Sequence, residues 1–233
     1  MSPERTYVPA DGMPPDLPAE ALARISQRIR GVGANREHAR LALRAVSYRF
    51  MAVTELDVSL AGQLQTPFGS LQAYEEERDL FNFFVNADSV FESFAYMAFA
   101  IAGCRKRQAF PFATPRDRMS VTIDSTIAAF MQTYPDGRLT TALRKLGSSP
   151  TRRRVRSMRN RLAHRATAPR NYHVGGGKDG LVVWRMSVHD LRDVPLVPAY
   201  IHDIRMLVAA RLCRLADAAD AFTAECERPS VLR

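Results

Sequence analysis

Residues 71–102, LQAYEEERDLFNFFVNADSVFESFAYMAFAIA, decide the fold of this 233-residue chain. Apolar side chains recur in this stretch at the three- and four-residue spacing of one helix face, at Phe84, Ala87, Phe91, Phe94, Ala98 and Ile101. Phe83, Val90 and Met97 widen that face, so more than one neighbour must cover it. The stretch therefore predicts a long helix, either at the centre of a bundle or with a second face for a dimer contact.

Shorter amphipathic segments lie on both sides of this stretch. We expect further helices over residues 19–30, 36–60, 119–132, 138–146, 151–165 and 198–225. Residues 172–174 and 181–186 flank a glycine-rich turn, and they predict a small β-hairpin before the last helix. The chain is therefore expected to be all-α in class, a helical bundle with one inserted hairpin.

The pattern divides the chain into three regions. Residues 1–17 are rich in proline and are expected to be flexible. Residues 18–66 form an N-terminal helical extension, and residues 67–228 form the helical bundle domain. At this length the bundle can bury a sizeable core without disulfides or metal ions.

The charge of the chain indicates a polyanionic partner. Its net charge is +9, and only three of its 33 basic residues are lysines. Arginine suits bidentate phosphate recognition, which places nucleic acid first among the expected partners and an anionic membrane surface second. A bias in coding composition would produce the same excess of arginine, and the sequence leaves that alternative open.

Other features of the sequence narrow the function classes. The three cysteines are far apart and in no metal-binding spacing, which is typical of free thiols in a reducing cytosol. Polar residues within 80–101 favour a buried helix over a membrane span, and the N-terminus has no apolar signal segment. We therefore expect a cytoplasmic protein that needs no metal ion, no cofactor and no membrane.

Residues 151–165, TRRRVRSMRNRLAHR, carry the candidate site. On a helical wheel Val155, Met158, Leu162 and Ala166 form a narrow core face. Arg153, Ser157, Asn160 and His164 form a stripe nearly opposite that face. His164 is therefore expected to point towards solvent or towards a partner.

These residue types suit the cleavage of RNA without a metal ion. Histidine titrates near neutrality, so His164 could move the protons of the 2′-hydroxyl and of the leaving 5′-oxygen. Arg159 could hold the phosphoryl oxygens, and Asn160 could orient the imidazole or donate to the phosphate. Five further arginines could contact the RNA backbone: Arg152, Arg153, Arg156, Arg161 and Arg165.

Residues 159–164, RNRLAH, resemble the R-x(4–6)-H signature of HEPN-domain ribonucleases, whose arginine is often followed by a polar residue such as asparagine. The order of elements over about 71–226 also resembles that family. The resemblance implies an up-and-down helical bundle and a metal-independent endoribonuclease that leaves 2′,3′-cyclic phosphate and 5′-hydroxyl ends. It also implies a homodimer, a role as a toxin or phage-defence effector, and an antitoxin or regulatory protein as a further partner.

The same resemblance implies an acidic residue from the earlier helix, either Asp88 or Glu92, and we favour Glu92. One geometric difficulty remains, because Arg159 and His164 lie about 140° apart on a regular helix. Either the helix loosens before Pro169, or two chains contribute residues to one cleft. Two other readings stay open, a non-catalytic HEPN-like module that binds nucleic acid or nucleotides, and a helical interaction protein.

Overall fold

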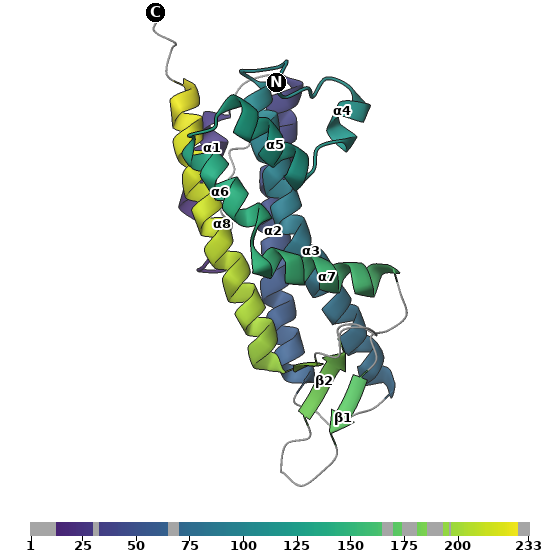
Figure 1. Ribbon diagram of the computed structural model, residues 1–233. Helices are drawn as coiled ribbons and strands as arrows, with labels where there is room; N and C mark the ends of the chain where they lie inside the picture. Colours follow the sequence, from purple (N-terminus) through teal and green to yellow (C-terminus); the bar gives the residue numbers. More distant parts are fainter. Residues whose placement is uncertain are drawn as a thin grey trace, which may run out of the picture. The chain divides into compact units, whose positions relative to one another are not determined.

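The chain is all-α in class, as the sequence predicts. A computed structural model describes residues 13–29, 33–64, 70–164, 170–173, 181–185, 193–195 and 197–227. The helices within these residues are α1 (Ala19–Arg28), α2 (Ala34–Gln63), α3 (Ser70–Gly103), α4 (Pro115–Met119), α5 (Ile123–Thr133), α6 (Arg138–Gly147), α7 (Pro150–His164) and α8 (Pro198–Glu227) (Figure 1).

Three short strands lie between α7 and α8. They are β1 (Arg170–His173), β2 (Leu181–Arg185) and β3 (Asp193–Pro195), and both strand pairs are antiparallel in the order β1-β2-β3. Asn171 pairs with Val183 in the first ladder, and Trp184 pairs with Val194 in the second. The glycine-rich turn expected at 175–180 and residues 1–12 of the segment 1–17 that was expected to be flexible lie outside the described residues. Within the described remainder of that segment, Leu17 is buried and its backbone N–H donates to the carbonyl of Pro14.

The chain forms two compact units. Unit 1 comprises Met1–Phe50, Ser89–Ser149 and Ala209–Arg233, and unit 2 comprises Met51–Asp88 and Pro150–Val208. The long helices α2, α3 and α8 each contribute residues to both units. The division therefore does not coincide with the expected boundary between 18–66 and 67–228.

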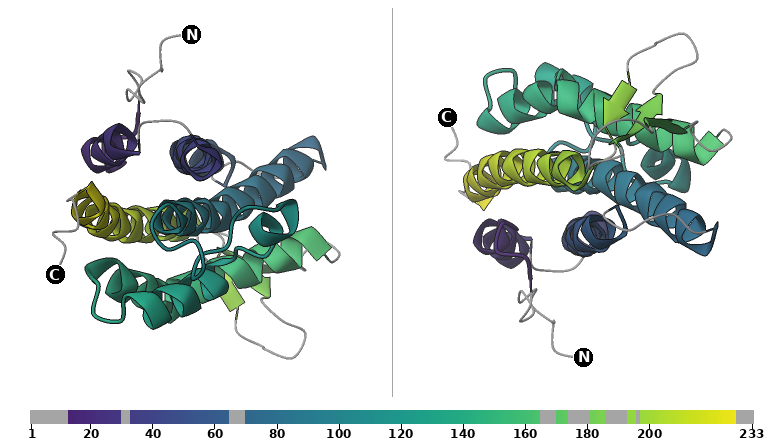
Figure 2. Two further views of the ribbon diagram at one scale, coloured as in Figure 1. Left: turned by 90° about the horizontal axis from the view of Figure 1, so that it is seen from above. Right: turned by 90° about the horizontal axis from the view of Figure 1, so that it is seen from below.

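In unit 1 the second half of α3 is almost wholly covered. Of residues 90–102, only Glu92 and Tyr96 keep appreciable access to solvent. The C-terminal part of α8 lies between α1 and α6 (Figure 2). Its Asp220 accepts hydrogen bonds from Arg24 and Arg28, which fixes α1 against α8.

An aromatic cluster fills the core of unit 1. The ring of Phe130 on α5 lies with its centroid 5.1 Å from that of Phe110, 5.8 Å from that of Tyr134 and 5.4 Å from that of Phe222. Phe110, Phe130 and Phe222 are buried, and the edge-to-face contacts of Phe130 with Phe110 and Phe222 add to the gain from burial.

Unit 2 combines an apolar core with buried carboxylates that have polar partners. Its buried apolar residues include Leu60, Leu80, Phe83, Phe84, Ala87, Val155, Met158, Ile201, Ile204 and Val208. Asp57 on α2 lies 2.9 Å from Nδ1 of His202 on α8. Asp79 on α3 accepts hydrogen bonds from Ser59 and Gln63 on α2. These polar contacts satisfy groups that burial would otherwise destabilise.

The sequence predicted that the chain has no membrane-spanning helix and that its cysteines are free thiols, and most of the residues concerned are described by the structure. Within the described residues, no helix is both long enough and apolar enough to cross a membrane. Cys104, Cys213 and Cys226 carry free thiols. Burial raises the pKa of all three thiols, and that of Cys226 rises to about 11.

We expect Phe130→Ala to lower the free energy of unfolding by about 3–5 kcal/mol, because it leaves a cavity among three aromatic rings. The neighbouring Met131→Ala is the matched control, since that side chain is 45% exposed and its loss should cost less than about 0.5 kcal/mol. Urea denaturation of both variants measures the difference. Equal losses would contradict the assigned core.

Candidate nucleic-acid interface

Helix α7 lies wholly in unit 2 and carries the residues of the candidate site. It begins at Pro150, where proline is tolerated because the first helical N–H needs no helical acceptor. Val155 and Met158 are fully buried, and Leu162 is half-buried. The core face expected from the sequence is therefore confirmed for these described positions, whereas Ala166 lies outside them.

A second stripe of α7 lies near a buried carboxylate. Asp88 on α3 is only 5% exposed, and its Oδ1 atom has no hydrogen-bond partner among the residues that the structure describes. The charges of Arg159, Arg156 and Arg152 act on this carboxylate. These three residues follow each other at spacings of four and three residues, so they share one side of the helix.

Two opposing effects act on the protonation of Asp88. Burial raises its pKa and is the larger effect, while the positive charges of Arg159, Arg156 and Arg152 lower it. The net result is a pKa above the ordinary value of an aspartate. The arginines therefore only partly offset the cost of burying the charge.

A third stripe of α7 faces away from the core. Arg153, Ser157 and Asn160 are exposed, as the wheel predicts. Arg159 is half-buried at the edge of this stripe, and it donates a hydrogen bond of 2.9 Å from Nη1 to Oδ1 of Asn160. The predicted pair of Arg159 and Asn160 is therefore in direct contact.

The helix continues through His164, but the structure describes only the backbone of that residue and not its side chain. Positions 159 and 164 on such a helix are about 140° apart. The described part of α7 thus shows no loosening that would bring them together.

Among the other predicted RNA contacts, Arg152 is buried, Arg153 and Arg156 are exposed, Arg161 is half-buried, and Arg165 lies outside the described residues.

Glu92, the favoured acidic residue, belongs to unit 1. Its Oε2 atom accepts a hydrogen bond of 3.3 Å from the backbone N–H of Ile123 at the start of α5. Such a contact stabilises a helix start, because a carboxylate satisfies an N–H that has no helical acceptor. A catalytic role for Glu92 stays a prediction, and Asp88 is the carboxylate on which the arginines of α7 act.

Glu92 also lines a shallow pocket of about 350 Å³ that the sequence did not predict. In this pocket Nδ1 of His38 lies 3.2 Å from the hydroxyl of Tyr96, and burial raises the pKa of that hydroxyl. Arg49 donates a hydrogen bond of 2.6 Å to Oγ of Ser93. His38 and Tyr96 are 58 residues apart, and no motif connects them, so sequence spacing alone could not have paired them.

The described residues contain no group of three or more His, Cys, Asp or Glu side chains placed to hold a metal ion. Comparison of the chain with protein families, curated proteins and solved structures finds no match. The function must therefore be argued from the residues themselves.

The raised pKa of Asp88 gives a test of its environment. The folded protein holds this proton more tightly than the unfolded chain, so the contribution of Asp88 to stability is greatest at low pH and falls as the pH rises through the raised pKa. Asp88→Asn removes that titration. We expect the variant to gain stability relative to the native protein between about pH 3 and pH 7.

Unfolding free energies of the two proteins across this range measure the effect, and Asp203→Asn at an exposed position of α8 is the matched control. A native protein that instead gains stability over Asp88→Asn as the pH rises would mean that attraction to the arginines outweighs burial.

Proposed function

We propose that the protein is a metal-independent endoribonuclease of HEPN type, built on a HEPN-like helical bundle. The observation that carries the proposal is the contact between Arg159 and Asn160 on a helix that continues to His164. This arrangement supports the R-N-x-x-A-H motif as one functional unit on α7. The exposed arginines of α7 favour a nucleic-acid substrate, because guanidinium groups bind phosphate oxygens bidentately.

In the proposed reaction the neutral imidazole of His164 takes the proton of the 2′-hydroxyl. The 2′-oxygen then forms a bond to phosphorus, the bond from phosphorus to the 5′-oxygen breaks, and the imidazolium returns the proton to that 5′-oxygen. Arg159 stabilises the charge on the non-bridging oxygens. Asn160 holds the guanidinium of Arg159 in place through its side-chain oxygen.

The regular helix favours a site shared between two chains. One phosphate cannot easily meet positions 159 and 164 of the same helix, since they lie about 140° apart. A homodimer can bring Arg159 of one chain and His164 of the other to one phosphate across a twofold axis. In this arrangement the negative charge of Asp88 attracts the arginine stripe of α7, and Asp88 acts as a positioning residue.

The biological setting follows from the same proposal. A nonspecific ribonuclease harms its own cell, so a role as a toxin or phage-defence effector in the cytoplasm, held in check by an antitoxin or regulatory protein, is consistent with this chemistry. Binding of RNA without cleavage would instead support the alternative of a non-catalytic HEPN-like module.

We expect the purified protein to cleave a labelled single-stranded RNA in EDTA and to leave 2′,3′-cyclic phosphate ends. His164→Ala should lower the rate by on the order of 100- to 10,000-fold, and Arg159→Ala by about 100- to 1,000-fold. Arg116→Ala is the matched control, since that arginine is exposed and lies on α4. Cleavage that persists in His164→Ala would contradict the proposal.

Mixing two inactive variants tests the shared cleft. An Arg159→Ala chain paired with a His164→Ala chain forms one damaged site and one intact site if each site combines two chains. After subunit exchange we expect about a quarter of the native activity, because half of the dimers are mixed and each has one intact site. No recovery in a mixture shown to contain mixed dimers would place both residues of a site in one chain.

A further inference from the structure

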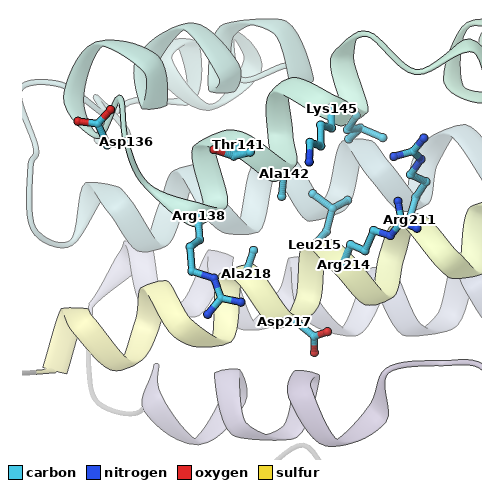
Figure 3. A pocket seen from close by; sticks show the side chains of 11 residues that line it. Asp136, Arg138, Thr141, Ala142, Lys145, Arg211, Arg214, Leu215, Asp217 and Ala218 are labelled. Atoms are coloured by element: carbon cyan, nitrogen blue, oxygen red, sulfur yellow. The ribbon is translucent and has the colours of Figure 1, made fainter.

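A second concave surface lies in unit 1, between α6 and the C-terminal part of α8 (Figure 3). Its volume is about 380 Å³, which is within the range of small-molecule sites. The floor is apolar and includes Leu146 and Leu215, which are 1% and 2% exposed. Four basic side chains surround this floor: Arg138 and Lys145 from α6, and Arg211 and Arg214 from α8. We call this surface the α6/α8 groove.

The basic residues of the α6/α8 groove differ from other arginines of unit 1. Arg24 and Arg28 are paired with Asp220, and Arg49 donates to Ser93. By contrast, the side chains of the four groove cations form no ion pair and no hydrogen bond with any residue that the structure describes. Positive charges that gather without counter-charges repel each other, and a bound anion removes that repulsion.

The acidic residues at the rim do not neutralise the groove. Figure 3 shows the carboxylate of Asp136 directed away from the space between the two helices, and that of Asp217 directed from α8 towards α1. In the same view Arg138 lies near one end of the groove, and Lys145, Arg211 and Arg214 lie near the other. Anionic groups of a ligand would therefore meet cations at both ends.

The dimensions of the groove favour a small molecule over a macromolecule. The lining residues extend from Arg138 to Leu146 on α6 and from Arg211 to Ala218 on α8, which corresponds to about 10–12 Å along each helix. This length accommodates one compact molecule, whereas a peptide helix or an RNA strand would extend well beyond the lining residues. Three arginines favour phosphate, whose oxygens match the planar guanidinium fork.

We infer that the α6/α8 groove is a binding site for a phosphorylated small molecule that carries an apolar body. The phosphates contact Lys145, Arg211 and Arg214, and the apolar body packs against the floor at Ala142, which is half-buried. Arg138 holds the other end of the ligand. This inference stands apart from the proposed ribonuclease activity, because none of these residues belongs to α7.

Calorimetric titration of the full chain tests the inference with four probes. ATP supplies both phosphates and an apolar body, pyrophosphate supplies only the phosphates, adenosine supplies only the body, and citrate supplies negative charge without phosphate. We expect ATP to bind more tightly than each of the other three by roughly 10-fold or more, since only ATP contacts both the cations and the floor.

Substitutions locate the site. Lys145→Ala and Arg214→Ala should each weaken ATP binding by roughly 10-fold, whereas Arg116→Ala, an exposed arginine of α4, should leave it unchanged. Ala142→Leu fills the groove without altering its charge, and it should abolish binding. If that variant unfolds more readily than the native protein, the charge reversal Lys145→Glu replaces it and should also abolish binding.

Three results would overturn the inference. They are an affinity for ATP no greater than that for citrate, an equal loss in Arg116→Ala and Arg214→Ala, and an absence of ATP binding. Binding of a short RNA or an acidic peptide in place of ATP, lost in the same variants, would assign the α6/α8 groove to a macromolecule and would likewise contradict it.

Discussion

The need to cover α3 on several sides is the constraint on which the structure depends. A single amphipathic face can be buried by one neighbour, but residues 90–102 are apolar almost all round, and only Glu92 and Tyr96 retain solvent access. Each large side chain removed from water contributes about 1.5–3 kcal/mol, so covering this helix outweighs most local preferences. The two residues that escape burial both line the pocket that contains His38.

The sequence predicted the helices well because a periodic apolar pattern records directly which side of a helix is buried. The expected helix at 71–102 is observed as Ser70–Gly103, and the buried positions of α7 are those that the wheel assigned to its core. The contacts between helices were harder to predict from the sequence. The division of α2, α3 and α8 between two units depends on which segments contact each other over long sequence separations, and helical periodicity carries no such information.

The same distinction applies to the candidate site. Arg159 and Asn160 are neighbours in sequence, so their contact could be anticipated. Asp88 and Glu92 are one turn apart on α3, so the helical pattern of the sequence could not decide which of them lies near the arginines of α7. The structure gives the two residues different surroundings. Arginines of α7 act on Asp88, whereas Glu92 accepts a hydrogen bond from the start of α5. The α6/α8 groove is lined by residues about 70 positions apart in the sequence. Their charges form one basic surface only in the folded chain, so the sequence pattern did not predict it.

The half-buried thiol of Cys226 has a consequence for the reactivity of that residue. The thiolate is the form that reacts with peroxide and with alkylating reagents. With a pKa of about 11, roughly one Cys226 side chain in ten thousand carries that charge at neutral pH. At neutral pH, peroxide and iodoacetamide are therefore expected to react more slowly with Cys226 than with a thiol of ordinary acidity.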